Sequence, residues 1–119
     1  MAVILTVDDS RAVRSIVGKQ VKGLGFDVVE AQDGAEGLER LLASHVDLVL
    51  LDVNMPNMDG PAMLKKMRER GDQTPVIMLT SESERSIVMN AMVLGISDYI
   101  LKPFKPEELR DKLLSVLQG

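Results

Sequence analysis

The feature that most constrains the fold is a short apolar run, Leu48 to Leu51, which ends on the acid Asp52. Four consecutive apolar residues lack the alternation of a strand with one solvent-facing side, so the run is typical of a parallel strand covered on both faces. Asp52 would then lie at the carboxyl end of that strand, where open α/β sheets bind their ligands. Asn54 and Pro56 follow Asp52. Asp, Asn and Pro are common in turns, so the segment also fits an ordinary turn.

The rest of the chain repeats this combination of an apolar run and a helical segment. Further strand-like runs occupy residues 2–7, 26–30, 76–79 and 98–101, and each is followed by apolar residues with helical spacing, the fourth helix continuing to Gly95. Five strands alternating with five helices predict an α/β fold with a single doubly wound, five-stranded parallel sheet. The expected order is the flavodoxin-like 2-1-3-4-5, with helices on both faces.

Composition narrows the class of protein. A length of 119 residues predicts one domain, residues 1–119. The absence of Cys excludes disulfides and thiolate metal sites. An aromatic content of 3% and a net charge of −4 argue against a nucleic-acid interface. The amino-terminal residues lack the basic region of a signal peptide and no apolar run is long enough to span a bilayer, so we expect a cytoplasmic protein without membrane insertion.

Polar residues follow four of the predicted strands at the same end. Asp8 and Asp9 follow the first, Asp52 the third, Thr80 the fourth and Lys102 the fifth. The first and third strands are neighbours in the expected order, so the three acids should converge in one cleft. Carboxylates this close repel one another unless a cation lies between them, and an all-oxygen site suits Mg²⁺. The hydroxyl and the lysine can hold phosphoryl oxygens beside a carboxylate that accepts a phosphoryl group.

Each of these residues also has a structural explanation when it is considered alone. Asp9 or Ser10 can cap the first helix, and Thr80 can cap the fourth. Lys102 can be a solvated surface lysine. His45, at the opposite end of the strands, fits a loop residue. The functional interpretation depends on the joint placement of the residues at four strand ends on one side.

Together these residues resemble the receiver domain of the response regulators of two-component signalling, and the resemblance covers the whole chain. It implies that Asp52 accepts a phosphoryl group from the phosphohistidine of a histidine kinase or phosphotransfer protein, and that the chain catalyses only its own phosphorylation and dephosphorylation. The residues that carry the similarity are Asp8, Asp9, Asp52, the segment Met55-Pro56-Asn57-Met58-Asp59-Gly60, Thr80 and Lys102-Pro103-Phe104.

The resemblance also implies a metal site. Mg²⁺, with Mn²⁺ as a substitute, would be bound by Asp9, Asp52 and the backbone carbonyl of Asn54, while Asp8 would act through the water molecules of the metal.

A conformational switch is implied as well. Thr80 and Lys102 would hold the phosphoryl oxygens, and Tyr99 would turn inward when Thr80 moves. The bond from Lys102 to Pro103 would be cis. Phosphorylation would remodel the face formed by the fourth helix, fifth strand and fifth helix, where a downstream effector protein would bind, with chemotaxis or motility control as the expected process.

Some positions depart from the usual family pattern. Ser81 stands where Ala or Gly is usual, and Gly37 and Ile96 replace residues that are more often Ala. Asn54 and Glu82 match the pair of chemotaxis-type regulators that lies along the route of the attacking water, so we expect them to tune hydrolysis and to give relatively fast self-dephosphorylation.

The sequence also fits other functions. The chain can be a phosphorelay intermediate, or a receiver cut from a larger regulator. An aspartate-nucleophile phosphatase would share Asp52 and Mg²⁺, but Asn54 stands where such enzymes have a second Asp. A flavodoxin-like cofactor binder is disfavoured because Asp8 and Asp9 would repel a phosphate. A scaffold that works without phosphorylation would typically have lost the acids or the lysine.

Overall fold

The computed structural model describes residues 1–118 of the chain. Its strands are β1 (Val3–Val7), β2 (Asp27–Ala31), β3 (Leu48–Asp52), β4 (Val76–Thr80) and β5 (Asp98–Leu101). The α-helices are α1 (Arg11–Gly23), α2 (Gly34–Ala43), α3 (Gly60–Glu69), α4 (Arg85–Ala91) and α5 (Pro106–Gln118). Two short 3₁₀ turns, η1 (Glu82–Glu84) and η2 (Met92–Leu94), flank α4. The predicted alternation of five strands and five helices is confirmed.

The strands form one parallel sheet in the order β2-β1-β3-β4-β5, as predicted. In the register, Val7 pairs with Leu51 across β1 and β3, and Asp52 pairs with Leu79 across β3 and β4. The residues that follow β1 therefore leave the sheet beside the last residue of β3. This topology brings the acids of two distant segments to one edge.

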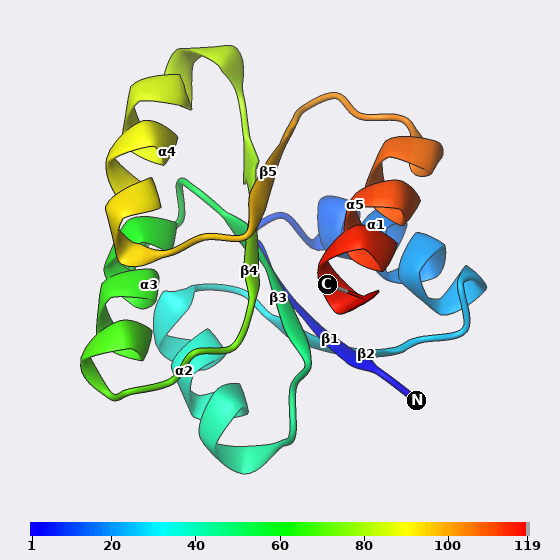
Figure 1. Cartoon of the computed structure of the whole chain (residues 1–119), viewed down its shortest axis with the longest axis horizontal. Coiled ribbons are helices and arrows are strands. Elements are labelled where there is room, and N and C mark those ends of the chain that lie inside the picture. Colours follow the sequence, from blue (N-terminus) through cyan, green and yellow to red (C-terminus); the bar gives the residue numbers. More distant parts are fainter. Residues whose placement is uncertain (119) are drawn as a thin grey trace.

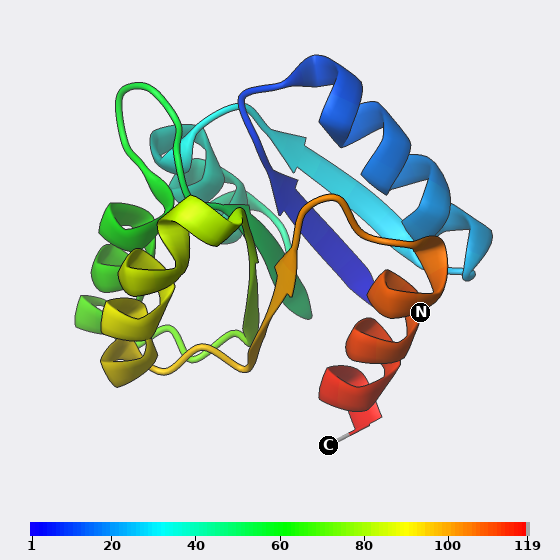
Figure 2. The same cartoon turned by 90° about the horizontal axis from the view of Figure 1, so that it is seen from above.

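Helices cover both faces of the sheet. Figures 1 and 2 show α2, α3 and α4 on one side and α1 and α5 on the other. Because side chains alternate along a strand, Val49 and Leu51 of β3 pack toward the first group, whereas Leu48 and Leu50 pack toward the second. Every residue of β3 is buried. This two-sided burial is the physical reason for the uninterrupted apolar run.

Side-chain caps start three of the helices. The hydroxyl of Ser10 accepts a hydrogen bond from the backbone N of Val13 at 3.2 Å and caps α1. The carboxylates of Asp33 and Asp59 cap α2 and α3 in the same way. Of the two caps proposed for the first helix, Ser10 is therefore the correct one, and Asp9 stays free for another role.

The segment after β4 differs from the prediction in two respects. Thr80 is the last residue of the strand, and Ser81 is the cap residue of η1, so the interpretation of Thr80 as a helix cap is wrong. The fourth α-helix ends at Ala91, and the chain reaches Gly95, at φ +85°, through a 3₁₀ turn. A left-handed residue that favours glycine closes the segment where the apolar pattern predicted a longer helix.

The loop after Asp52 is attached to the start of α2. The amide of Asn57, a residue at φ +65°, donates to Asp33 Oδ2 at 3.0 Å, and the backbone N of Gly34 donates to Met58 O at 2.9 Å. The loop then returns to the strand, because Gly60 N donates to Val53 O at 2.9 Å. These bonds fix the path of the chain around the acid. Within residues 1–118, no helix combines the length and the apolar character that crossing a membrane requires.

Candidate functional site

Three carboxylates meet at the carboxyl edge of the sheet. Asp8, Asp9 and Asp52 each offer an oxygen, and these oxygens lie within 4.8 Å of one another. Asp8 and Asp52 are buried, whereas Asp9 is exposed. The convergence predicted from the strand order is confirmed for all three acids, and Asp9 leaves the cluster open to solvent on one side.

Lys102 supplies the positive charge of the site. Its Nζ lies 2.7 Å from Asp52 Oδ1 and 3.6 Å from Asp8 Oδ2, and its side chain is 32% exposed. The backbone N of Lys102 donates to Thr80 O at 2.7 Å, which continues the pairing of β4 and β5. The interpretation of Lys102 as a solvated surface lysine is therefore wrong. The peptide bond between Lys102 and Pro103 is cis, as the resemblance implied.

The electrostatics of the site follow from this crowding. Burial raises the pKa of Asp52, the hydrogen bond from Lys102 opposes that change, and the charge of Asp8 adds to it, so that the net direction is upward. Burial lowers the pKa of Lys102, but the hydrogen bond and charge of Asp52, with the charges of Asp8 and Glu84, raise it further than burial lowers it. One lysine charge thus faces three carboxylates, and negative charge is in excess.

The donor set fits a hard divalent cation. Asp8 Oδ1 accepts from the backbone N of Ser10 at 2.9 Å, but the buried Asp8 Oδ2 has no hydrogen-bond partner among residues 1–118. A buried carboxylate oxygen that accepts no hydrogen bond is costly, and its nearest cation, the Lys102 ammonium at 3.6 Å, is bonded to Asp52 instead, so a further cation would stabilise the oxygen. All the available ligand atoms are oxygens, which Mg²⁺ prefers. The residues present therefore fit a Mg²⁺ ion held by the cluster of Asp8, Asp9 and Asp52.

The hydroxyl predicted for the site does not touch the acids in this structure. Thr80 is buried at the end of β4, and its Oγ1 donates to the backbone carbonyl of Ser81 at 3.1 Å. Tyr99, on β5, is half-buried and packs against the core on the side of α2, α3 and α4, while Lys112 Nζ lies 5.9 Å from its ring centroid. Thr80 therefore ends β4 beside the site, whereas Tyr99 lies on the neighbouring strand β5, paired with Met78.

Glu84, a residue that the sequence analysis did not single out, contacts the loop that follows Asp52. The side-chain amide of Asn54 donates to Glu84 Oε2. Glu82, the acid singled out from the sequence, instead lies 3.8 Å from Arg85 in an exposed ion pair. The pattern of Ser81 followed three residues later by Glu84 was visible as a helix-capping signal, but nothing in the sequence indicated that this acid reaches Asn54.

His45 lies outside the site. It is exposed in the loop before β3, and its Nε2 is 2.8 Å from Asp47 Oδ1. The other oxygen of Asp47 accepts from the backbone N of Val3 at 2.7 Å, at the amino end of β1. The assignment of His45 as a loop residue remote from the acids is confirmed.

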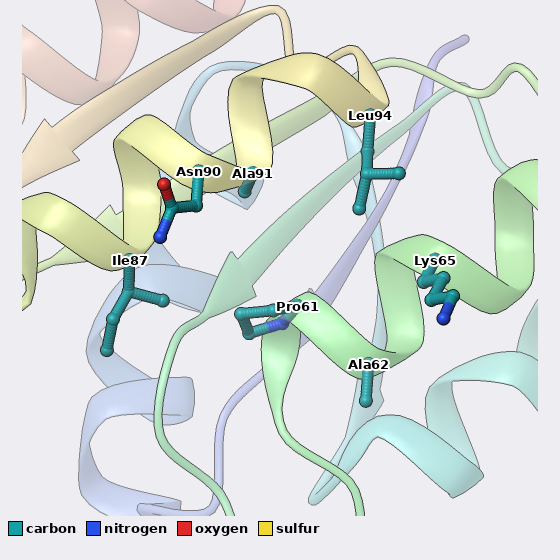
Figure 3. Close-up of a pocket in the computed structure, with 7 residues that line it drawn as sticks. All are labelled: Pro61, Ala62, Lys65, Ile87, Asn90, Ala91 and Leu94. Carbon is teal, nitrogen blue, oxygen red and sulfur yellow. The ribbon is translucent and has the colours of Figure 1, made fainter.

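A separate hollow of about 370 Å³ lies between α3 and α4. Figure 3 shows Ile87 of α4 and Leu94 of η2 extending toward α3. No acid of the cluster lines it, so it is distinct from the site at the strand ends. Its lining residues are Pro61, Ala62, Lys65, Ile87, Asn90, Ala91 and Leu94.

Comparison with known sequences identifies relatives of two kinds. The chain is 42% identical to the chemotaxis protein CheY1 of Helicobacter pylori over 118 residues, 96% of this chain and 95% of that protein. It is 40% identical to the probable transcriptional regulator ycf27 of Porphyridium aerugineum, over 97% of this chain but 48% of that regulator. The chain thus spans about half the length of the transcriptional relative and nearly all of the chemotaxis relative.

Comparison with solved structures agrees with the sequence matches. The chemotaxis response regulator CheY4 of Vibrio cholerae superposes with a TM-score of 0.90 at 35% identity, covering 98% of both chains. The receiver domain of NtrX from Brucella abortus superposes with a TM-score of 0.91 at 27% identity, again covering 98% of both. The family described as the response regulator receiver domain matches residues 4–114. Since this match covers nearly the whole chain and the fold and relatives agree with it, the chain belongs to the response regulator receiver domain family of two-component signalling.

Proposed function

We propose that the chain is a phosphorylation-activated switch in which Asp52 accepts a phosphoryl group from a histidine kinase or a phosphotransfer protein. The observation that supports this most directly is the Asp52 carboxylate at the carboxyl end of β3, with the Lys102 ammonium 2.7 Å away and two further acids around it. In the transfer, an Asp52 oxygen forms a bond to phosphorus as the phosphorus–nitrogen bond of the donor phosphohistidine breaks. The donor imidazole leaves with the electron pair of that bond.

The acids and the lysine have separate tasks. Asp9, Asp52 and the backbone carbonyl of Asn54 would bind Mg²⁺, or Mn²⁺ in its place, and Asp8 would hold the waters of the ion. When bound, the metal supplies positive charge for the phosphoryl oxygens. Lys102 contacts Asp52 directly, so it is placed to follow the added negative charge onto a phosphoryl oxygen.

Thr80 and Tyr99 would carry the signal outward. Among residues 1–118 the Thr80 hydroxyl is bonded only to the neighbouring carbonyl of Ser81, a bond that it can exchange for one to a phosphoryl oxygen. The space that Thr80 leaves would let the Tyr99 ring turn inward. The effector face would then be α4, β5 and α5, and the exposure of Met89 in α4 and of Val93 in the adjoining η2, at 55% and 88%, supports a protein contact there.

We propose chemotaxis or motility control as the process, in the cytoplasm, with a protein effector and no nucleic-acid contact or membrane insertion. The near end-to-end match to a chemotaxis protein supports this, whereas the transcriptional relatives are about twice as long. A phosphorelay intermediate, or the receiver of a larger regulator, is the alternative that those longer relatives favour. In each case residues 1–119 would act as a single receiver, with no catalysis beyond its own phosphorylation and dephosphorylation.

The test is the intact mass of the protein after incubation with acetyl phosphate, a small phosphoryl donor. We expect one phosphoryl adduct that requires Mg²⁺ and is absent in Asp52→Asn. The Asp59→Asn variant is the matched control, because Asp59 is an exposed helix cap outside the cluster and Asn also caps helices. An adduct that persists in Asp52→Asn, or that forms equally in EDTA, would contradict the proposal.

A further inference from the structure

Glu84 connects the two loops that border the acidic site. Its Oε1 accepts a hydrogen bond from the backbone N of Ser81 at 2.9 Å, in the loop that follows Thr80. Its Oε2 accepts from the side-chain amide of Asn54, two residues after Asp52. Each carboxylate oxygen therefore has a partner of its own, one on each loop.

The position of this carboxylate is fixed by the backbone around it. The backbone N of Glu84 donates to Ser81 O at 3.1 Å, so Ser81 and Glu84 bind each other reciprocally, as in a capping box. The charge of Glu84 also helps to raise the pKa of Lys102. Asn54, by contrast, is exposed in the loop that follows β3. The bond to Glu84 is thus what orients the Asn54 amide.

The orientation of an amide matters because its two ends are chemically opposite. The nitrogen carries two donors and the oxygen is an acceptor. With Nδ2 held by Glu84, the Oδ1 of Asn54 is the end left to accept a hydrogen bond. A water molecule that attacks phosphorus needs such an acceptor for one of its protons, so that its lone pair points at the phosphorus atom.

We propose that Glu84 is a positioning residue for the hydrolysis of phosphorylated Asp52, and that it acts by fixing the amide of Asn54 with Oδ1 available to the attacking water. The inference rests on the proposed function. In the step concerned, the water oxygen bonds to phosphorus and the bond between phosphorus and the Asp52 oxygen breaks. Inorganic phosphate leaves with the protons of the water, and Asp52 returns to its carboxylate form.

The expected effect of removing the contact is a longer-lived phosphoryl group. In Glu84→Ala the Asn54 side chain is free to sample three χ1 wells and two amide orientations, so it spends roughly one-sixth of its time in the productive geometry. The lifetime should therefore rise by up to about sixfold. Glu84→Asp keeps the charge near Lys102 but is one methylene shorter and cannot reach both partners, so it should also lengthen the lifetime.

The experiment phosphorylates the full chain with acetyl phosphate and Mg²⁺, removes the donor, and follows the adduct by intact mass. The variants are Glu84→Ala, Glu84→Asp, Asn54→Ala and the double variant Glu84→Ala with Asn54→Ala. We expect Glu84→Ala to have no further effect once Asn54 is Ala, because Glu84 acts through that side chain. An unchanged lifetime in Glu84→Ala, independent effects in the double variant, or a normal lifetime in Glu84→Asp would overturn the inference.

A second readout requires no phosphorylation. The side-chain amide resonances of Asn54, identified by their loss in Asn54→Ala, should shift in the NMR spectrum of unphosphorylated Glu84→Ala. Unchanged resonances would overturn the inference. Failure of every variant and of the unsubstituted chain to form an adduct would instead contradict the proposed function, and the NMR comparison would still decide whether Glu84 orients Asn54.

Discussion

At the scale of single residues, the buried hydroxyl of Thr6 in β1 destabilises the fold. The residue is 1% exposed, and its hydroxyl has no hydrogen-bond partner among residues 1–118. Burying an unpaired hydroxyl is unfavourable, and Val has nearly the same shape without the polar atom. We expect Thr6→Val to raise the free energy of unfolding by about 1 kcal/mol, measured by urea denaturation.

Thr74 is the matched control for this prediction. Its hydroxyl donates to Asp72 Oδ1 at 2.6 Å, so Thr74→Val removes a bond that exists. This variant should lower the free energy of unfolding by about 1 kcal/mol. A destabilised Thr6→Val would show that the hydroxyl of Thr6 has a partner in solution.

Gly60 packs closely against the backbone of Asp52. A Cβ atom at this position would overlap the backbone carbonyl oxygen of Asp52, which cannot move without shifting the strand end. We expect Gly60→Ala to cost about 2 kcal/mol of stability and to weaken Mg²⁺ binding. Gly23→Ala, in α1, is the control, because a Cβ there meets nothing within 4 Å. If Gly60→Ala is as stable as Gly23→Ala, the close packing behind Asp52 is not rigid.

The residues of the site differ in how far they could be predicted. Asp8 and Asp52 stand at the ends of neighbouring strands, so the strand order predicted that they meet, and Lys102 stands at the same edge of the sheet after β5. The bond between Asn54 and Glu84 could not be predicted in this way, because Asn54 lies on a loop and Glu84 ends a single 3₁₀ turn, and neither continues a periodic pattern. Periodicity gives the direction of side chains in strands and helices, but it gives none for a loop.

At the scale of elements, Asp33 couples α2 to the loop that follows Asp52. Its Oδ1 accepts from Glu36 N at 2.9 Å, and its Oδ2 accepts from the Asn57 amide at 3.0 Å. Asp33→Ala removes the helix cap and the loop contact together. We expect it to lower the free energy of unfolding at pH 7 by about 1 to 2 kcal/mol in urea denaturation. Asp33→Asn can still cap the helix and should lose less.

The same carboxylate predicts a pH dependence. The hydrogen bond from Glu36 N, helped by the Asn57 amide, holds the pKa of Asp33 below its ordinary value of 3.8, although burial opposes the change. A lowered folded-state pKa stabilises the fold above the unfolded-state pKa, and this contribution is lost as the pH falls through the folded-state pKa. Between pH 7 and 5 the contribution of Asp33 should therefore be constant; it should begin to fall below about pH 4 and be lost as the pH passes through the lowered folded-state pKa.

Urea denaturation at pH 6 and at pH 3.5 tests this pH dependence. On acidification the unsubstituted chain should lose more stability than Asp33→Asn, because Asn has no proton to bind. Equal losses in the two proteins would show that the pKa of Asp33 is not lowered in the fold.

Strands and helices could be predicted where the spacing of apolar residues was continuous. Their ends could not be predicted to the residue. Residues 48–51 are apolar because both faces of β3 are covered, and the predicted strand agrees with Leu48–Asp52. The second strand begins at Asp27, one residue later than predicted. The fourth α-helix ends at Ala91, because the backbone tightens into a 3₁₀ turn before the left-handed Gly95. Such endings depend on local backbone geometry that apolar spacing does not specify.

At the scale of the whole molecule, the sheet concentrates negative charge at one edge. The order β2-β1-β3-β4-β5 places the ends of β1 and β3 side by side, so that three carboxylates from two segments meet there, and Lys102 pairs with two of them, Asp8 and Asp52. Removing this repulsion with a cation should stabilise the entire fold, because the unfolded chain does not hold the acids together.

Mg²⁺ should therefore raise the thermal unfolding midpoint of the chain. At a concentration one hundred times the dissociation constant, a ligand that binds only the folded state contributes about 2.7 kcal/mol, which corresponds to on the order of 10 °C for a domain of this size. Calorimetry in Mg²⁺ and in EDTA, at matched ionic strength, measures the difference. Asp9→Ala is the informative variant, because Asp9 is exposed and does not cap α1, so its loss should spare the fold and abolish the response to Mg²⁺. An undiminished Mg²⁺ response in Asp9→Ala would exclude Asp9 as a ligand and place the stabilising ion elsewhere on the molecule.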